Sequence, residues 1–180
     1  ELWIDASNSR RSFQEISRMN GSETLHLANL KSLCGKRLRA AARILFEYAG
    51  RIDPGDGPLE LYLDDGTVVL FDGSADGEGL RVQYAPWVDP FVAPISEENR
   101  VYIEQSGKWS RVERSNDPLF VDLFGGVISS LTILDNEFGR EAGVQISIGG
   151  NDIWFVVAGD ECHVHWTQPI GFRKSASYTQ

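Results

Sequence analysis

Two stretches of the chain alternate apolar and polar side chains on either side of a tight-turn dipeptide. They are LELYLDDGTVVLF (59–71) and VQISIGGNDIWFV (144–156). Strict alternation is typical of a β-strand with one buried face. The dipeptides Asp65-Gly66 and Gly150-Asn151 are of the kind that closes hairpins. Each stretch is therefore expected to form an antiparallel hairpin, which restricts the chain to β-rich folds.

The segments around these hairpins repeat in the same order. LCGKRL (33–38) and LFGGVI (123–128) each follow a short segment of helical character, and Asp117-Pro118 is a good start for the second helix. Gly35 and Gly125 stand where a helix end favours a left-handed residue. The sequence thus predicts repeat unit one at 22–87 and repeat unit two at 117–166. Chance similarity between hairpins is the alternative explanation.

The expected fold is α+β and mainly antiparallel, with two similar helix-plus-four-strand units packed as a pseudo-symmetric pair within one compact domain, 1–180. Residues 88–116 are expected to connect the units and to contain a hairpin that turns at Ser106-Gly107, a helix across Gly107 being the weaker alternative. Residues 1–21 and 167–180 are predicted to be polar tails that dock loosely or fray.

Alternation also predicts which side chains form the core. The residues expected to be buried are Leu38, Ile44, Leu61, Leu63, Val82, Ile128, Ile146, Ile148, Val164 and Trp166. Arg39, Arg43 and Gln145 are expected on exposed faces, with the arginines forming a solvated basic stripe along the first strand.

Charge and composition restrict the classes of partner. The net charge of −9 disfavours binding to nucleic acid through phosphates and suits a basic protein partner. No apolar run approaches the roughly 20 residues that span a bilayer, so no membrane contact is expected. Two cysteines are too few for a disulfide framework and indicate a reducing compartment, the cytoplasm. The chain starts at Glu1, which leaves a removed leader open, and nothing in it specifies an oligomeric state.

Two segments resemble metal sites. FDGSADGEGL (71–80) begins like a calcium loop, but the twelfth position from Asp72 is Gln83 and both flanks resemble strands. His163 and His165 share one face of a predicted strand, and no third ligand is evident. We therefore expect a polar turn in the first segment, surface histidines in the second, and no metal or cofactor at either.

Catalytic motifs are missing from the sequence. It contains no G-x-S-x-G, no phosphate-binding glycine loop and no H-E-x-x-H. Cys162 and His163 are adjacent on a strand and point to opposite faces, so they cannot form a nucleophile–base pair. No catalytic residue is predicted, and Cys162 is expected to be a small buried side chain.

A resemblance supplies a functional hypothesis. The strand after L-x-G, the hairpin with an aspartate-glycine turn and the acid before the last strand resemble small bacterial proteins found among polymorphic-toxin immunity genes. The residues that carry it are LCGKRL, LYLDDGTVVLF and DGEGLRV, with weaker echoes in LFGGVI and GDECHVHW. The resemblance implies a stoichiometric binding protein, possible partners being basic toxin domains, and assigns no functional residue.

Two functions follow as hypotheses. The first is an intracellular immunity-type protein that covers the active site of a toxin with an acidic surface. The residues predicted to bind the partner are Asp64, Asp65, Asp72, Asp76, Glu78 and Trp87. The second is an enzyme or small-ligand-binding domain that uses the cleft between the two repeat units.

Overall fold

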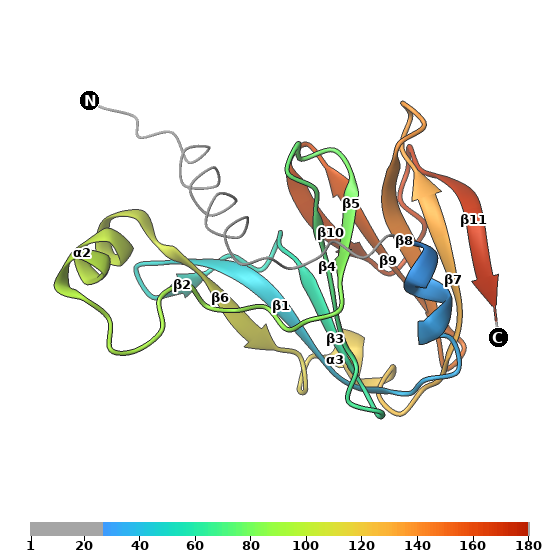
Figure 1. Ribbon diagram of the computed structural model, residues 1–180, viewed down its shortest axis with the longest axis horizontal. Helices are drawn as coiled ribbons and strands as arrows, with labels where there is room; N and C mark the ends of the chain where they lie inside the picture. The colour runs from blue at the N-terminus through green and yellow to red at the C-terminus, as the bar shows by residue number, and fades with distance from the viewer. Residues whose placement is uncertain (1–26, 180) are drawn as a thin grey trace.

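Two antiparallel β-sheets make up most of the computed structural model, which describes residues 27–179 (Figure 1). The first sheet contains β1 (Leu38–Tyr48), β2 (Arg51–Ile52), β3 (Leu59–Leu63), β4 (Val68–Gly73), β5 (Leu80–Gln83) and β6 (Lys108–Glu113). The second sheet contains β7 (Ile128–Asp135), β8 (Glu141–Ile148), β9 (Asn151–Ala158), β10 (Glu161–His165) and β11 (Arg173–Thr179). The helical elements are the 3-10 helix η1 (Leu27–Leu33), α2 (Glu97–Ser106) and α3 (Pro118–Val121). The expected β-rich antiparallel fold is confirmed.

Each sheet is built around a four-stranded meander. The strand order is β2-β1-β3-β4-β5 in the first sheet and β10-β9-β8-β7-β11 in the second. An additional strand pairs with the first strand of each meander: β6 with β1, and β11 with β7. None of the helices in residues 27–179 has the length and apolar character needed to cross a bilayer.

The two meanders are joined where β1 and β7 begin. The backbone N–H of Gly35 donates to the carbonyl of Ile128, and that of Gly125 donates to the carbonyl of Leu38, both at 2.8 Å. Gly35 has φ 89° and Gly125 has φ 79°, so both adopt the left-handed conformation predicted for them. The two bonds run in opposite directions between the segments, and they hold the starts of the two sheets together.

The hairpin turns lie close to their predicted positions. The β3–β4 turn contains Asp65 and Gly66, as expected, with φ 86° at Gly66. In the second hairpin Ile148 pairs with Asn151, so the turn consists of Gly149 and Gly150, at φ 60° and 90°. The predicted turn at Gly150-Asn151 is thus wrong by one residue. Two successive positive φ values define the hairpin turn with the twist that strands favour, and two glycines adopt them without steric cost.

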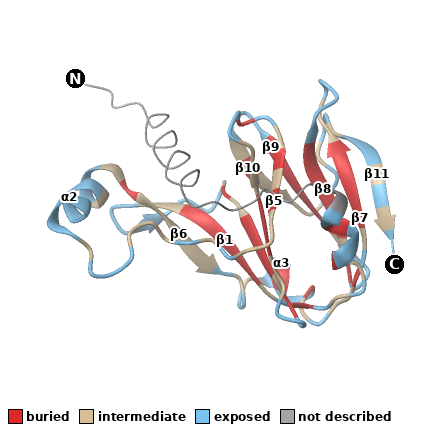
Figure 2. Cartoon of the chain, viewed as in Figure 1, coloured by how far each residue is buried: buried red, intermediate tan, exposed pale blue. Residues whose placement is uncertain are grey.

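The hydrophobic core lies between the two sheets (Figure 2). Phe71 of β4 and Phe155 of β9 are fully buried there, with ring centroids 6.0 Å apart. Burial is confirmed for Leu38, Ile44, Leu61, Leu63, Val82, Ile128, Ile146 and Ile148. Val164 and Trp166 are only half-buried, because they lie at the margin of the core, where Trp166 packs edge-to-face on Phe120.

The predicted basic stripe of the first strand is wrong at Arg43, whose side chain is 5% exposed. The register of β1 against β3 shifts between Leu38 and Ala40, a β-bulge. A bulge adds one residue and so reverses the faces of the strand that follows it. Leu38 and Ala41 therefore both face the core, and Arg43 follows on the same side. Arg39, next to the bulge, is exposed as expected.

Gln145 is also buried, contrary to prediction, with 7% of its surface exposed. Its cross-strand neighbour Trp154 belongs to a second apolar cluster, which Phe172 of the C-terminal segment joins. The amide Nε2 of Gln145 donates to Asp152 Oδ2 at 2.8 Å. The sheet thus carries apolar packing outside the main core, and simple alternation does not predict it.

The predicted connection and C-terminal tail need correction. Residues 97–106 form α2 instead of a hairpin arm, and only the second half of the segment is a strand, β6. Ser96 caps the helix by accepting from Asn99 N, two glutamates follow in its first turn, and Gly107 ends it. Residues 173–179 form β11 instead of a loose tail. The predicted tail at 1–21 and the start of repeat unit one at 22–26 lie outside the described residues.

Candidate functional site

The buried Arg43 marks the place where the two sheets exchange polar contacts. Its Nη2 donates to the carbonyl of Gly57 at 2.9 Å, with longer contacts of 3.4 Å to the carbonyls of Gly55 and Cys162. Desolvation, with a smaller contribution from Arg114, lowers the pKa of Arg43 to about 10. Arg43 therefore links β1 to the segment 53–58 and to β10 of the opposite sheet.

The segment 53–58 is held against β10 through Gly57. This residue has φ 145°, and a Cβ built on it would lie 1.9 Å from the carbonyl oxygen of Ile44. Its N–H donates to the carbonyl of Cys162 at 2.8 Å. Only glycine fits such a close approach between backbones. The tether places Asp56, the preceding residue, beside the two neighbours of Cys162.

Asp56, Glu161 and His163 form a polar cluster at this junction. Asp56 Oδ1 lies 2.6 Å from His163 Nδ1, and one ligand atom from each of the three residues lies within 4.8 Å of the others. Glu161 and His163 are two apart on β10 and so share a face. All three side chains are half-buried.

His165 follows on the same face, and its ring centroid lies 6.0 Å from that of His163. Desolvation, followed by the neighbouring His163 and Arg43, lowers the pKa of His165. The sequence predicted ordinary surface histidines, and the structure adds that His163 contacts a carboxylate, Asp56, from a distant segment.

Cys162 is a core residue, as predicted, and belongs to the main cluster between the sheets. Burial raises the pKa of its thiol far above the ordinary value, with Asp72 adding to the effect. A thiol held in its neutral form is a poor nucleophile. The expectation that Cys162 is a small buried side chain is confirmed.

The five predicted partner-binding acids are divided between opposite ends of β4. Asp64 and Asp65 lie in the turn before this strand, whereas Asp72 ends it and the other two follow. Asp64 accepts from the backbone of Arg37, and Asp65 Oδ2 lies 2.8 Å from Lys36 Nζ. Asp72 is paired with Arg81. These acids are partly neutralised within the protein.

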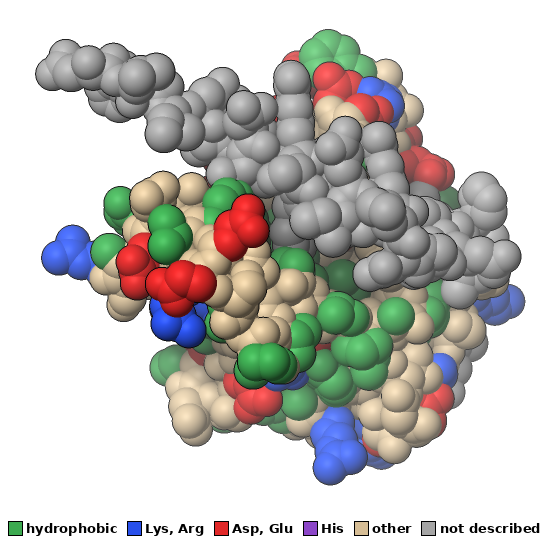
Figure 3. Space-filling model, turned by 60° about the vertical axis from the view of Figure 1, so that its left-hand side comes forward, with side chains coloured by type: hydrophobic (Ala, Val, Ile, Leu, Met, Phe, Trp, Pro, Cys, Tyr) green, Lys and Arg blue, Asp and Glu red, His purple; other side chains and the backbone are tan. Residues whose placement is uncertain are grey.

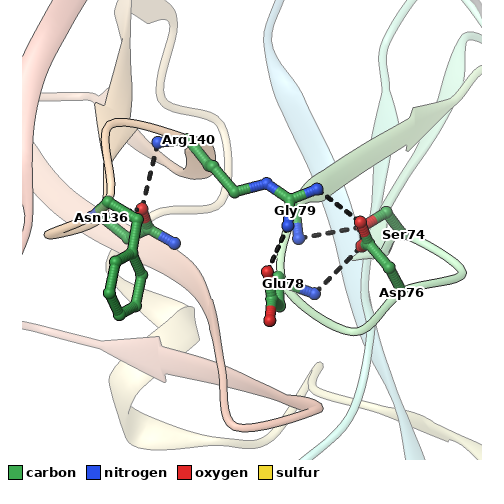
Figure 4. Close-up of polar contacts among 7 residues, drawn as sticks. Ser74, Asp76, Glu78, Gly79, Asn136 and Arg140 are labelled. Atoms are coloured by element: carbon green, nitrogen blue, oxygen red, sulfur yellow. Dashed lines mark hydrogen bonds and ion pairs between the residues drawn. The ribbon is translucent and has the colours of Figure 1, made fainter.

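The loop that resembled a calcium site, 71–80, is organised by its own hydrogen bonds and by an arginine (Figure 4). Asp76 accepts from Ser74 Oγ and from Glu78 N, and Gly79 N donates to Ser74 Oγ. Arg140 of the β7–β8 turn forms ion pairs with both Asp76 and Glu78. The bond from Ser74, followed by those from Glu78 and Arg140, lowers the pKa of Asp76 to about 2. The guanidinium occupies the position between the carboxylates, in agreement with a polar turn.

Trp87 lies on the outer face of the first sheet and is half-buried. Its backbone N–H donates to Glu60, a fully buried carboxylate in β3. Glu60 also accepts from Tyr62 and, at 2.7 Å, from Arg111 Nε of β6. Trp87 thus belongs to a buried polar network that sequence reasoning missed. A glutamate at an alternating position looks like any surface acid until its covering segment is known.

An exposed apolar surface that was not anticipated from the sequence belongs to the segment 88–106. α2 buries none of its side chains, and it exposes Val101 and Tyr102. Figure 2 shows the helix at the exposed end of the molecule, and in Figure 3 apolar and acidic side chains lie side by side on this end. Val88 and Val92, two thirds exposed, precede the helix. We call Val88, Val92 and α2 the arm surface.

Comparison of the chain with models of known protein families, with curated proteins and with solved structures gives no match. The arm surface and the polar cluster of Asp56, Glu161 and His163 are therefore the two candidate sites.

Proposed function

We propose that the protein is a cytoplasmic binding protein that engages a protein partner through its arm surface. The observation that supports this proposal is the exposure of α2. A ten-residue helix is marginal in water on its own, and helices in proteins owe most of their stability to packing of an apolar face. Within residues 27–179 none of the α2 side chains is buried, although Tyr102 stacks on Phe91, and a partner would supply the missing burial.

The charge of the arm surface favours a basic partner. α2 carries Glu97, Glu98 and Glu104 against a single basic residue, Arg100, within a chain of net charge −9. Apolar side chains surrounded by charges of one sign combine burial with electrostatic steering. A basic toxin domain whose active site is covered fits this chemistry, and it is the partner implied by the resemblance to immunity proteins.

Affinity purification from the source cells tests the proposal with two variants, each of which carries two substitutions. We expect the wild-type chain to retain a partner, and the double variant Val101→Ser, Tyr102→Ser to lose it. The control, Asp64→Asn with Asp65→Asn, removes acids from the predicted site at the β3–β4 turn and should retain the partner. Circular dichroism should verify that both variants are folded, since all four replaced residues are exposed.

Each contrary result refutes this placement of the interface. Loss of the partner with the control and retention with the α2 variant would assign binding to the turn acids, the site first predicted. Recovery of no protein, together with turnover of a small molecule by the purified chain, would favour the second candidate. That candidate is an enzyme or small-ligand-binding domain, and it is supported by the polar cluster between β10 and the segment 53–58.

We also propose that the two halves of the chain are a pseudo-symmetric pair. Apart from the two-residue strand β2, the order helix, strand, strand, strand, strand occurs in both, and the bulge in β1 has a counterpart in β7 between Ile128 and Ser130. Duplication of one unit explains both features. Superposing 33–84 on 123–166 in a crystal structure tests it, and strands that fail to overlay in order would refute it.

A further inference from the structure

We propose that Asp56, Glu161 and His163 bind a divalent transition-metal ion, zinc being the best fit. The three residues place one ligand atom each within 4.8 Å of one another. They come from two segments more than 100 positions apart in the chain, which the fold brings to one point. This inference is independent of the arm surface and of partner binding.

Hydrogen bonds hold both backbone segments that carry the ligands, 53–58 and β10. Gly57, next to Asp56, donates to the carbonyl of Cys162, which stands between Glu161 and His163. Arg43 closes the same junction, with Nη2 within reach of the Gly57 and Cys162 carbonyls. A metal site needs ligands held in place by the surrounding structure, and here each ligand is adjacent in sequence to a tethered residue.

The donor set selects the class of metal. One imidazole nitrogen and two carboxylate oxygens suit zinc and related transition metals, whereas calcium takes six to eight oxygens. Three protein ligands also leave a fourth tetrahedral position open for water or a small ligand. Two carboxylates exceed the single positive charge of nearby Arg43, so the site is net negative when His163 is neutral.

The sequence led us to expect no metal at His163 and His165, because it offered no third ligand. The structure instead gives His163 two carboxylate neighbours, Asp56 at 2.6 Å from its Nδ1 and Glu161 on the same strand, and His165 is not part of the group. The competing explanation is a simple ion pair between Asp56 and His163. In the metal-bound form the metal ion would lie between the two side chains that this contact now joins.

Calorimetric titration of zinc and of calcium into the metal-free protein distinguishes the two explanations. We expect one zinc site per chain with an affinity in the micromolar range or tighter, and markedly weaker binding of calcium. His163→Ala and Asp56→Asn should each weaken zinc binding by at least about tenfold, as even loss of an outer-shell partner costs 10- to 100-fold.

Glu137→Gln is the matched control, since Glu137 is exposed in the β7–β8 turn and its replacement removes one negative charge away from the cluster. It should leave zinc affinity within about twofold of the wild type, and circular dichroism should verify that each variant is folded. Zinc binding absent at millimolar concentration, or equal in the wild type, His163→Ala and Asp56→Asn, would overturn the proposal.

Discussion

Replacing Glu60 by alanine is expected to lower the free energy of unfolding by about 3 kcal/mol, near the lower end for breaking a buried ion pair. The Glu60 carboxylate is fully buried and accepts from Arg111 Nε, Tyr62 and the backbone of Trp87. Its removal leaves the tyrosine hydroxyl and the tryptophan N–H without their acceptor. Arg111 is 29% exposed and can turn to water, which keeps the loss from being larger. Urea denaturation measures the change.

Glu113→Ala is the matched control, because Glu113 pairs with the same arginine. Its side chain is 68% exposed and lies 3.1 Å from Arg111 Nη1. Exposed ion pairs contribute about 0–1 kcal/mol, so this variant should unfold almost like the wild type. Equal decreases in the free energy of unfolding for Glu60→Ala and Glu113→Ala would show that the burial of Glu60 does not add to stability.

Gly57→Ala is expected to destabilise the protein by about 3 kcal/mol or more, the range of substitutions that disturb strained backbone or buried hydrogen bonds. The added Cβ would stand 1.9 Å from the backbone oxygen of Ile44, which no side-chain rotation relieves. The segment would have to move away from β1 and β10. Such a movement would disturb the bonds that Gly57 makes with Cys162 and Arg43.

Gly50→Ala separates the steric clash from left-handed strain. Gly50 has φ 73° and nothing within 4 Å of its ideal Cβ, so only the conformational cost, about 1 kcal/mol, applies. Thermal and urea denaturation should show that the Gly57→Ala variant is much less stable than the Gly50→Ala variant. Similar stabilities for the two variants would contradict the close packing at Gly57.

Local sequence rules predicted the β3–β4 turn, placed the β8–β9 turn within one residue and identified the glycines after two helices, because these signals lie within a few residues. Asp65-Gly66 closes β3 and β4, and Gly35 and Gly125 adopt positive φ after their helices. The prediction of which β1 side chains face the core is wrong after Leu38, because a bulge depends on how the strand pairs with its partner. The alternation of apolar and polar residues does not indicate it. One inserted residue was enough to place Arg43 inside the protein.

The hairpin predicted at residues 99–114 is wrong for a different reason. Residues 99–114 alternate well enough for a strand, yet Ser96 and the following glutamates begin a helix and Gly107 ends it. β11 was missed because a polar sequence such as RKSASYT has a weak strand signal, and its pairing with β7 supplies the order.

The candidate sites could be predicted only in part from the sequence. His163 was identified as a possible ligand, but Asp56 lies in an ordinary DPGDGP segment whose position beside β10 depends on the tertiary fold. The turn acids were identified from charge alone, and partners such as Lys36 and Arg140 come from other elements. The sequence shows which residues are charged, whereas the ion-pair partners that neutralise them are known only from the folded structure.

Hydrogen exchange across α2 is the measurement that tests the proposed partner-binding role most directly. Helical amides without buried side chains open easily, so residues 97–106 of the free chain should exchange much faster than those of β8, whose interior is buried. After addition of the partner recovered by affinity purification, exchange in α2 should slow strongly while exchange in β8 stays unchanged. Exchange in α2 that is equally fast with and without the partner would contradict the assignment of binding to the arm surface.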